Sequence, residues 1–393
     1  MNKAKLMQLI MLSLLISFGS VGVVCITPGM PEIAHYFQIN DEWLGFTISF
    51  YLFGYAFGQL IYGALTNRFG GKVAINIGVI LTVIGCIGIV YSYYCNVFWV
   101  LLFFRVIMAL GAASGLKMTF TLVHKLFSND ETPRILGLLT ISFAVIPGLA
   151  VYFSSELVEH FGWVAPFYFM IVYSSVIIVL NQVFPDVCLP TKSALSCRSI
   201  IKGYTAQFQS RQVIFGGLLL GLGSCFVYVF STLSPILAMN VMGLSPNKYG
   251  AYNLLPTLGI LVGSLASNYF GKVWAPIKSL KIGLLVISIG VGCLTILVAM
   301  LHNPFSIFAP MIIIYIGLSF IFGNSSTLAL KNISDVSNAS AVMSFINILS
   351  SVILVICLSN FDLNNILLLP MIFVILCFVG VFWFANLIKA IEK

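Results

Sequence analysis

Uninterrupted apolar runs of about 20 residues recur along nearly the whole chain, and they limit its fold more than any other feature. One helix of about 20 apolar residues crosses a hydrocarbon core about 30 Å thick. Only 8% of the residues are charged, whereas an ordinary soluble domain carries roughly a quarter. Runs such as Ile80–Val90 and Leu284–Met300 are continuous, unlike the alternating segments of about ten residues in transmembrane β-barrels. The sequence therefore predicts an all-α membrane protein.

Twelve apolar segments are long enough for transmembrane helices, and a polar stretch divides them into two sets of six. The predicted spans are 8–28, 43–66, 73–93, 98–122, 135–157, 163–184, 212–233, 249–270, 280–301, 305–329, 338–359 and 365–388. The first span is too long for the apolar region of a signal peptide and lacks a small-residue cleavage site. We therefore expect an N-terminal six-helix half at 1–184, a cytoplasmic linker at 185–211 and a C-terminal six-helix half at 212–393.

The distribution of basic residues predicts the orientation of the chain. If the N-terminus is cytoplasmic, sixteen lysines and arginines fall in inside loops, and only Lys248 falls in an outside loop. Because basic residues are retained on the cytoplasmic side, we expect a multi-pass protein of the cell inner (cytoplasmic) membrane with both termini cytoplasmic. This asymmetry also accounts for the net charge of +8. A nucleic-acid partner is the alternative explanation of a positive charge, but no basic cluster is dense enough to indicate one. Five acidic residues fall outside, namely Glu32, Asp41, Glu42, Glu159 and Asp362.

A short motif occurs at the same place in each half. The segment 63–73 (Gly-Ala-Leu-Thr-Asn-Arg-Phe-Gly-Gly-Lys-Val) follows the second span, and 263–273 (Gly-Ser-Leu-Ala-Ser-Asn-Tyr-Phe-Gly-Lys-Val) follows the eighth. Small residues let helix ends approach closely, and glycine adopts the positive φ that ends a helix. A basic side chain can reach the carbonyl groups of a neighbouring helix end. The pattern indicates a repeated cytoplasmic turn; the alternative is any short membrane hairpin with basic residues.

The first of these loops resembles the loop signature of the major facilitator superfamily. Within that superfamily, 53–63, 105–111 (Arg-Val-Ile-Met-Ala-Leu-Gly) and 28–33 (Pro-Gly-Met-Pro-Glu-Ile) resemble the bacterial drug/proton antiporters that include the bicyclomycin-resistance exporters. The segments 228–235 and 243–246 do so as well. The resemblance implies the major facilitator fold and a transport function. It also implies a conformational role for the loop residues Gly63, Asn67, Arg68, Gly70, Gly71 and Lys72.

Two basic residues lie inside the predicted fourth span. Inserting an arginine near the centre of a membrane helix costs about 2.5–3.5 kcal/mol, so Arg105 needs an interior partner or a water-filled cavity. The resemblance implies a cavity arginine that couples conformation to protonation or substrate. The alternative is an arginine that bonds backbone carbonyl groups for structural reasons. Lys117 is close enough to the cytoplasmic end for its amine to reach the surface, and its role is left open.

Carboxylates, in contrast, are missing from the middle of every predicted span. Proton antiport usually relies on a membrane carboxylate that alternates between proton and substrate. Where the resembling antiporters carry two aspartates and a pair of glycines, this chain has Val24, Asn67, Ser154 and Ser155. These departures weaken the proton-antiport interpretation. Glu32 at the outer end of the first span is the substitute proton site, and its alternative interpretation is a solvated loop carboxylate.

Polar and aromatic residues within the spans are candidates for a solute site. Tyr51, Tyr55 and Gln59 recur every fourth residue, so they form one stripe on a helix. Such a stripe could line a cavity or could pack helices through interhelical hydrogen bonds. The further candidates are Tyr228, Asn253 and Asn324.

We therefore expect a secondary active transporter that exports drug-like or amphipathic metabolites by alternating access. The alternative is an importer or facilitator of a nutrient or siderophore-like metabolite. A membrane enzyme is disfavoured, because the chain has no HExxH, GxSxG or phosphate-loop motif. We expect a small-molecule substrate, contact with membrane lipid, protons as the candidate coupling ion, a monomeric state, and neither a cofactor nor a metal site.

Overall fold

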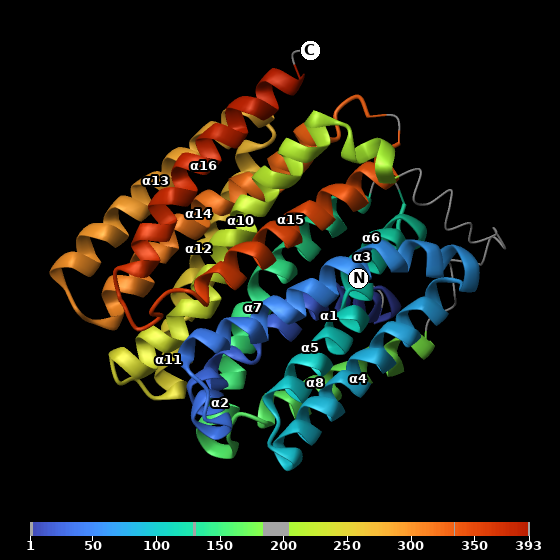
Figure 1. The fold of residues 1–393 in the computed structure, drawn as a ribbon. Helices are drawn as coiled ribbons and strands as arrows, with labels where there is room; N and C mark the ends of the chain where they lie inside the picture. The colour runs from blue at the N-terminus through green and yellow to red at the C-terminus, as the bar shows by residue number, and fades with distance from the viewer. Residues whose placement is uncertain (1–2, 129–130, 184–203, 334, 392–393) are drawn as a thin grey trace.

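Helices make up nearly all of the part of the chain that the computed structural model describes, which is residues 3–128, 131–183, 204–333 and 335–391. Within these ranges no strand is present, and the expected all-α class is confirmed. The α-helices (Figure 1) are α1 (Lys3–Val24), α2 (Met30–Phe37), α3 (Gly45–Phe69), α4 (Gly71–Cys95), α5 (Phe98–Ala112), α6 (Ser114–Leu126), α7 (Thr132–Phe161), α8 (Ala165–Val183), α10 (Arg211–Pro235), α11 (Pro246–Tyr252), α12 (Leu254–Phe270), α13 (Pro276–Met300), α14 (Pro304–Ala329), α15 (Val336–Leu358) and α16 (Leu368–Ile391). Between them lie two 3₁₀ helices, η1 (Thr27–Gly29) and η2 (Asp41–Leu44), and a π-helical stretch, η3 (Ile236–Val241).

Eleven of the described helical segments are long and apolar enough to cross a membrane unaided. The predicted eighth span is the exception, because it is broken at Asn253 into α11 of 7 residues and α12 of 17 residues. Pro256 has no N–H to donate to the carbonyl group of Tyr252, so the hydrogen-bond ladder is interrupted there. Counted together, α11 and α12 occupy the predicted span, and the twelve-span arrangement holds.

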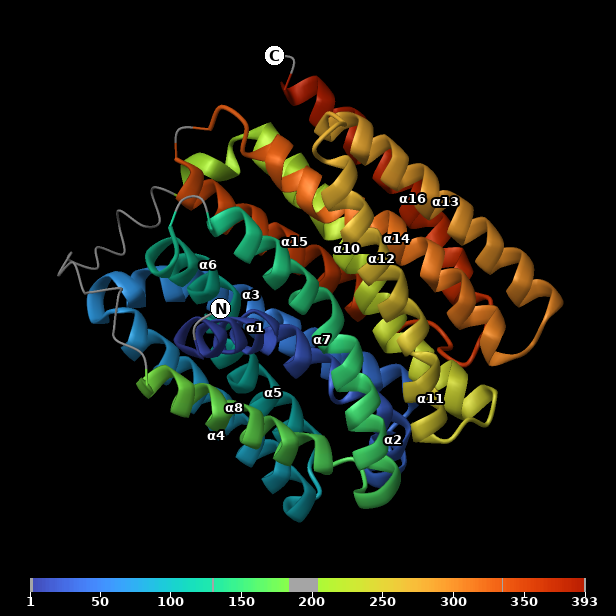
Figure 2. The same cartoon turned by 180° about the vertical axis from the view of Figure 1, so that it is seen from behind.

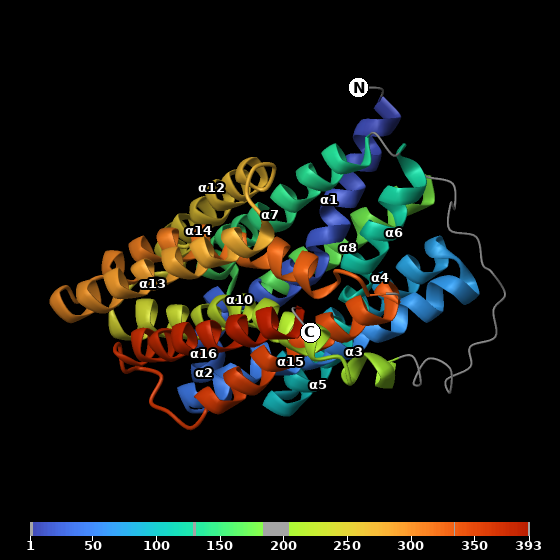
Figure 3. The same cartoon turned by 90° about the horizontal axis from the view of Figure 1, so that it is seen from above.

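The helices form two groups that lie side by side. In Figures 1 and 2, α1 to α8 occupy one side and α10 to α16 the other, and Figure 3 shows the helices from above, where parts of the two groups overlap. The groups meet where α3 packs on α15 and where α7 packs on α11 and α12. The predicted linker at 185–211 lies mostly outside the described residues, and its end at 204–208 is helical.

Each long helix runs between two polar faces of the molecule. We call the face that holds residues 38–44 and 242–245 the acidic face, because Asp41, Glu42 and Glu159 lie there. It is at the lower left of Figure 1, near the labels α2 and α11. We call the opposite face, which holds the turn at Gly70, the basic face. Its described basic residues include Lys5, Arg68, Lys72, Lys125, Arg211, Lys272, Lys278, Lys281, Lys331 and Lys389.

The repeated sequence motif forms two different turns on the basic face. In the first half, the single residue Gly70 joins α3 to α4 with φ 88° and ψ 165°, a conformation that favours glycine. In the second half, Gly271 keeps a right-handed φ of −60°, and α13 begins only at Pro276. Proline is well suited to the first position of a helix. The Trp274 ring also stacks on Phe270, with centroids 4.1 Å apart. The two segments therefore align in sequence without a gap but form turns of different backbone conformation and length.

Close helix contacts are made at glycines. On α4, a Cβ atom added to Gly85 would lie 2.5 Å from the backbone nitrogen and Cα of Met108 on α5. On α13, a Cβ atom added to Gly292 would meet nothing within 4 Å. The two glycines therefore differ in packing, although both lie in the middle of long apolar helices.

We predict that Gly85→Leu destabilises the protein, whereas Gly292→Leu leaves its stability nearly unchanged. Overpacking of a tight contact costs about 1–3 kcal/mol, because α4 and α5 must separate to admit the side chain. Thermal unfolding of the two variants in detergent measures the difference. Equal unfolding temperatures for the two variants would contradict the described α4–α5 packing.

Candidate functional site

The side chain of Arg105 on α5 is fully buried and bonded to three backbone carbonyl groups. Its Nη1 donates to Gly22 O at 2.7 Å, and its Nη2 donates to Val23 O at 3.1 Å. Its Nε donates to Thr47 O at 3.0 Å. Among the described residues, no carboxylate forms an ion pair with Arg105. The guanidinium group therefore joins α1, α3 and α5 through main-chain acceptors.

The place where α1 ends explains why these acceptors are available. Gly22 and Val23 lie in the last turn of α1, where carbonyl groups lack partners within the helix. A helix also carries a partial negative charge at its C-terminus, which stabilises a nearby cation. The Arg105 guanidinium carbon lies 4.3 Å from the centre of the Tyr51 ring, close enough for a cation–π interaction. These contacts match the carbonyl-bonding interpretation of Arg105; a coupling role remains a proposal.

Tyrosines from both groups of helices meet beside Arg105. Tyr51 and Tyr55 are buried on α3 with ring centroids 6.4 Å apart, and the Tyr51 hydroxyl donates to Gly19 O at 2.9 Å. The hydroxyl of Tyr228 on α10 is near enough to interact electrostatically with those of Tyr51 and Tyr55. Tyr315 on α14 interacts with Tyr228 in the same way. We call Tyr51, Tyr55, Tyr228 and Tyr315 the tyrosine cluster.

Gln59 continues the α3 stripe below the tyrosine cluster. Its side chain is only 5% exposed. Its amide nitrogen has no acceptor among the described residues. Leaving a buried donor unpaired costs about 1–3 kcal/mol, so this amide still lacks a stabilising acceptor. Three of the predicted solute-site residues, Tyr51, Tyr55 and Gln59, thus lie together near Tyr228, and their role in a solute site stays a prediction.

The remaining predicted residues lie elsewhere. Glu32 is exposed on α2 at the acidic face, where its carboxylate accepts the backbone N–H of Trp163. Asn253 is half-buried at the break between α11 and α12. The Asn324 amide donates to Phe320 O of its own helix at 2.8 Å. Within the described part of the chain, no hydrogen bond links these three residues to the tyrosine cluster. Tyr315, which is in the cluster, was not predicted, because a tyrosine in an apolar run carries no positional signal.

The loop-motif residues lie on the basic face. Lys72 donates from Nζ to the carbonyl oxygen of Gln182 at 3.1 Å, in the last turn of α8. Arg68 is exposed, with its guanidinium carbon 5.9 Å from the Phe69 ring centre. Gly71 is buried as the first residue of α4. The surroundings of Gly63 and Asn67 lie outside what the structure describes.

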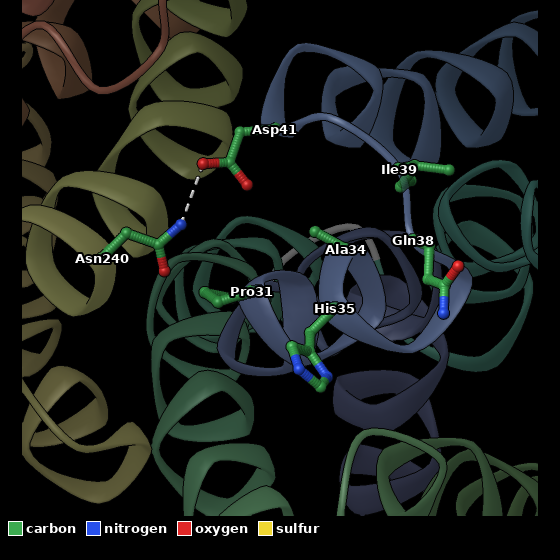
Figure 4. Close-up of a pocket in the computed structure, with 7 residues that line it drawn as sticks. All are labelled: Pro31, Ala34, His35, Gln38, Ile39, Asp41 and Asn240. Carbon is green, nitrogen blue, oxygen red and sulfur yellow. Dashed lines mark hydrogen bonds between the residues drawn. The ribbon is translucent and has the colours of Figure 1, made fainter.

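A hydrogen-bonded connection between the two groups of helices lies at the acidic face. The Asp41 Oδ2 atom accepts from the side-chain amides of Asn240 and Asn364, each at 3.0 Å. We call these three residues the clasp. A pocket of about 500 Å³ lies beside it, and Figure 4 shows Asp41 and Asn240 bonded across this pocket from His35 and Gln38. Asp41 was expected in an outside loop, but its two partners are about 200 and more than 300 residues away in the chain and carry no local sequence signal.

Comparison with known proteins places this arrangement in context. Residues 10–358 match the family model for the Major Facilitator Superfamily. The chain is 22% identical over 290 residues to a bicyclomycin resistance protein homolog of Haemophilus influenzae, covering 70% of this chain and 69% of that protein. It is 23% identical over 245 residues to the multidrug transporter MdfA of Edwardsiella ictaluri, covering 62% of this chain and 58% of that protein. A D-xylose–proton symporter has a TM-score of 0.79 and 12% identity, covering 96% of this chain and 97% of the symporter. The last likeness shows the fold alone.

We predict that Arg105→Gln destabilises the protein by several kcal/mol, because each carbonyl group left unpaired costs about 1–3 kcal/mol. Arg105→Lys restores only part of this loss, since an ammonium group lacks the planar fork that reaches acceptors on two helices. Thermal unfolding in detergent is the measurement. Arg211→Gln, at an exposed helix start, is the control and stays near wild type. An Arg105→Gln variant as stable as this control would contradict the bonding described here.

Proposed function

The chain belongs to the major facilitator superfamily, and we propose that it exports small drug-like or amphipathic organic solutes by alternating access. The observation that carries the proposal is the tyrosine cluster, which is uncharged and is built by α3, α10 and α14 from both groups of helices. Tyr51, Tyr55 and Tyr315 are buried, and Tyr228 is half-buried. Small-molecule sites are mostly apolar and aromatic, with a few placed polar groups. The relatedness to a bicyclomycin resistance homolog and to a multidrug transporter supports export of such compounds.

In this proposal the basic face is cytoplasmic and the acidic face external. The excess of lysine and arginine on the basic face supports this orientation, with both termini on the cytoplasmic side of the bacterial inner membrane. The described conformation is then closed to the outside by the clasp. Release of solute outward requires Asp41 to separate from Asn240 and Asn364, while α3 and α15, and α7 and α12, rock against each other. One monomer contains all of these parts.

Coupling to protons is the less supported part of the proposal. A proton crossing 100 mV releases about 2.3 kcal/mol, but among the described residues no carboxylate lies in the middle of a span. Glu32 is the proposed coupling group, and its place on the acidic face gives it access to external protons. The same absence of a membrane carboxylate favours the second candidate function, an uncoupled facilitator or importer.

Energised export predicts a specific pattern of accumulation. Cells that express the protein should hold less of a transported labelled amphiphile than cells without it, and an uncoupler should remove the difference. The measurement is steady-state accumulation, with and without uncoupler, at equal expression. Higher accumulation in expressing cells would overturn export and support import. An unchanged difference with uncoupler would overturn proton coupling.

We predict that Asp41→Ala increases external access to the interior, because it removes both acceptor bonds of the clasp. Cys25, which is buried below the acidic face, reports this access through its labelling by a membrane-impermeant maleimide, read by peptide mass spectrometry. Cys95, half-buried at the acidic-face end of α4, is the internal reference.

The matched control for the clasp is Glu42→Ala. Glu42 adjoins Asp41 in η2 and has no hydrogen bond or ion pair within the described ranges. We expect faster Cys25 labelling in Asp41→Ala alone, relative to Cys95. The same rate in Asp41→Ala as in wild type, or the same increase in Glu42→Ala, would show that the clasp does not hold the acidic face closed.

A further inference from the structure

Lys117 lies on the side of α6 that continues the contact between α5 and α3. Gly54 of α3 packs on the backbone of Val106, and Gly58 packs on Leu110 and Ala113. Positions 106, 110, 113 and 117 follow the spacing of a single helix face. Because α3 and the α5–α6 pair both run from the acidic to the basic face, the residues one turn beyond Gly58 and Ala113 are Tyr62 and Lys117. The Thr66 hydroxyl of α3 also donates to Met118 Sδ at 3.0 Å, so Lys117, the residue before Met118, lies at the level of residues 62–66 of α3.

A line of buried polar side chains leads from the tyrosine cluster to this level. Tyr55, Gln59 and Tyr62 are each less than 8% exposed, and their spacing places them on one side of α3. Tyr55 and Tyr62 are seven residues apart, which is about 10 Å along the helix at 1.5 Å per residue. This is the length of a small drug-like molecule. Midway along this line is the unpartnered amide nitrogen of Gln59.

Lys117 is a cation within the predicted fourth span whose charge has no partner among the described residues. It is half-buried by other residues, and within the described ranges it forms no ion pair or side-chain hydrogen bond. Arg105, the other cation within the spans, donates to three carbonyl groups and faces the Tyr51 ring. A charge inside a membrane protein that lacks a partner is costly and marks a substrate or ion pathway.

We propose that the Lys117 ammonium group recognises an anionic group of the transported solute, so that the substrate class is an amphipathic organic anion. The inference rests on the proposed transport function. The Gln59 amide donates to the same solute, and the tyrosine cluster contacts its apolar part. Two interior cations without a described interior carboxylate create a positive potential. This potential attracts an anion and repels a lipophilic cation, and such opposite effects on competing ligands produce specificity.

Three naphthalene probes with one ring system test the charge preference. These are 2-naphthalenesulfonate, its neutral sulfonamide and 2-naphthyltrimethylammonium. Binding to the full-length protein in detergent is measured by equilibrium dialysis, and transport of the two charged probes is measured in proteoliposomes. Wild-type protein should bind the sulfonate most tightly and transport it in preference to the trimethylammonium probe.

Variants assign this preference to Lys117. Lys117→Gln should weaken sulfonate binding about tenfold or more, as expected for loss of a charge-assisted hydrogen bond, and should change sulfonamide binding little. Lys117→Arg should retain most of the sulfonate affinity. Lys125→Gln, an exposed lysine two turns further along α6, is the matched control and should bind like wild type. Thermal unfolding shows whether each variant is folded. If Lys117→Gln is not folded, the sulfonate affinity of Lys117→Arg is compared with that of wild type instead.

The possible outcomes separate this inference from the proposed function. Preferential transport of the trimethylammonium probe, or equal sulfonate affinity in Lys117→Gln and wild type, would overturn the inference and leave transport of amphiphiles intact. An equal loss of sulfonate and sulfonamide binding in Lys117→Gln would assign Lys117 a structural role and also overturn it. Failure of wild-type protein to bind or transport any of the three probes would overturn both.

Discussion

The bonds between Arg105 and the end of α1 are the interaction on which the arrangement of the first helices depends. In lipid, every backbone polar group must find its partner within the protein. Helix α1 leaves its last carbonyl groups open in the middle of the fold, and Arg105 supplies donors that satisfy those of Gly22 and Val23. The Arg105 charge and the unpaired carbonyl groups at the end of α1 would each cost free energy in a membrane. Their hydrogen bonds to each other reduce both costs. This junction holds α1, α3 and α5 together around the tyrosine cluster.

The same constraint separates the charges of the protein by function. The carboxylate of Asp41 works at the acidic face, where it accepts two amide hydrogen bonds that can exchange for water when the groups of helices move. The interior of the described spans instead offers hydroxyl and amide groups, together with Lys117. A clasp that opens must lie near water, whereas a group that recognises a charged solute gains strength where water is scarce. The proposed transport cycle uses both environments.

Particular residues show how far the sequence could predict this site. The four-residue spacing of Tyr51, Tyr55 and Gln59 placed them correctly on one stripe, because helical periodicity is local. The meeting of Tyr228 and Tyr315 with that stripe was beyond local pattern, since it depends on how two groups of helices face each other. Glu32 was expected at the outer end of the first span, and it lies there, exposed on α2 at the acidic face; its role as a proton site stays a prediction. The longer second turn after Gly271 was hidden by a motif that aligns without a gap. The break at Asn253 lies outside that motif, in a segment whose hydropathy predicts a single span.

By itself, the sequence determined the all-α membrane class, the number and place of the spans and the membership of the family, because apolar length and loop motifs are properties of contiguous residues. Only the tertiary structure decided which polar groups meet. Arg105 could have faced a carboxylate, water or main-chain carbonyl groups, and the choice depended on where α1 ends relative to α5. The partners of Asp41 and the contact between Thr66 and Met118 were likewise decided by helix packing, since they join residues that are distant in the chain and carry no shared sequence signal.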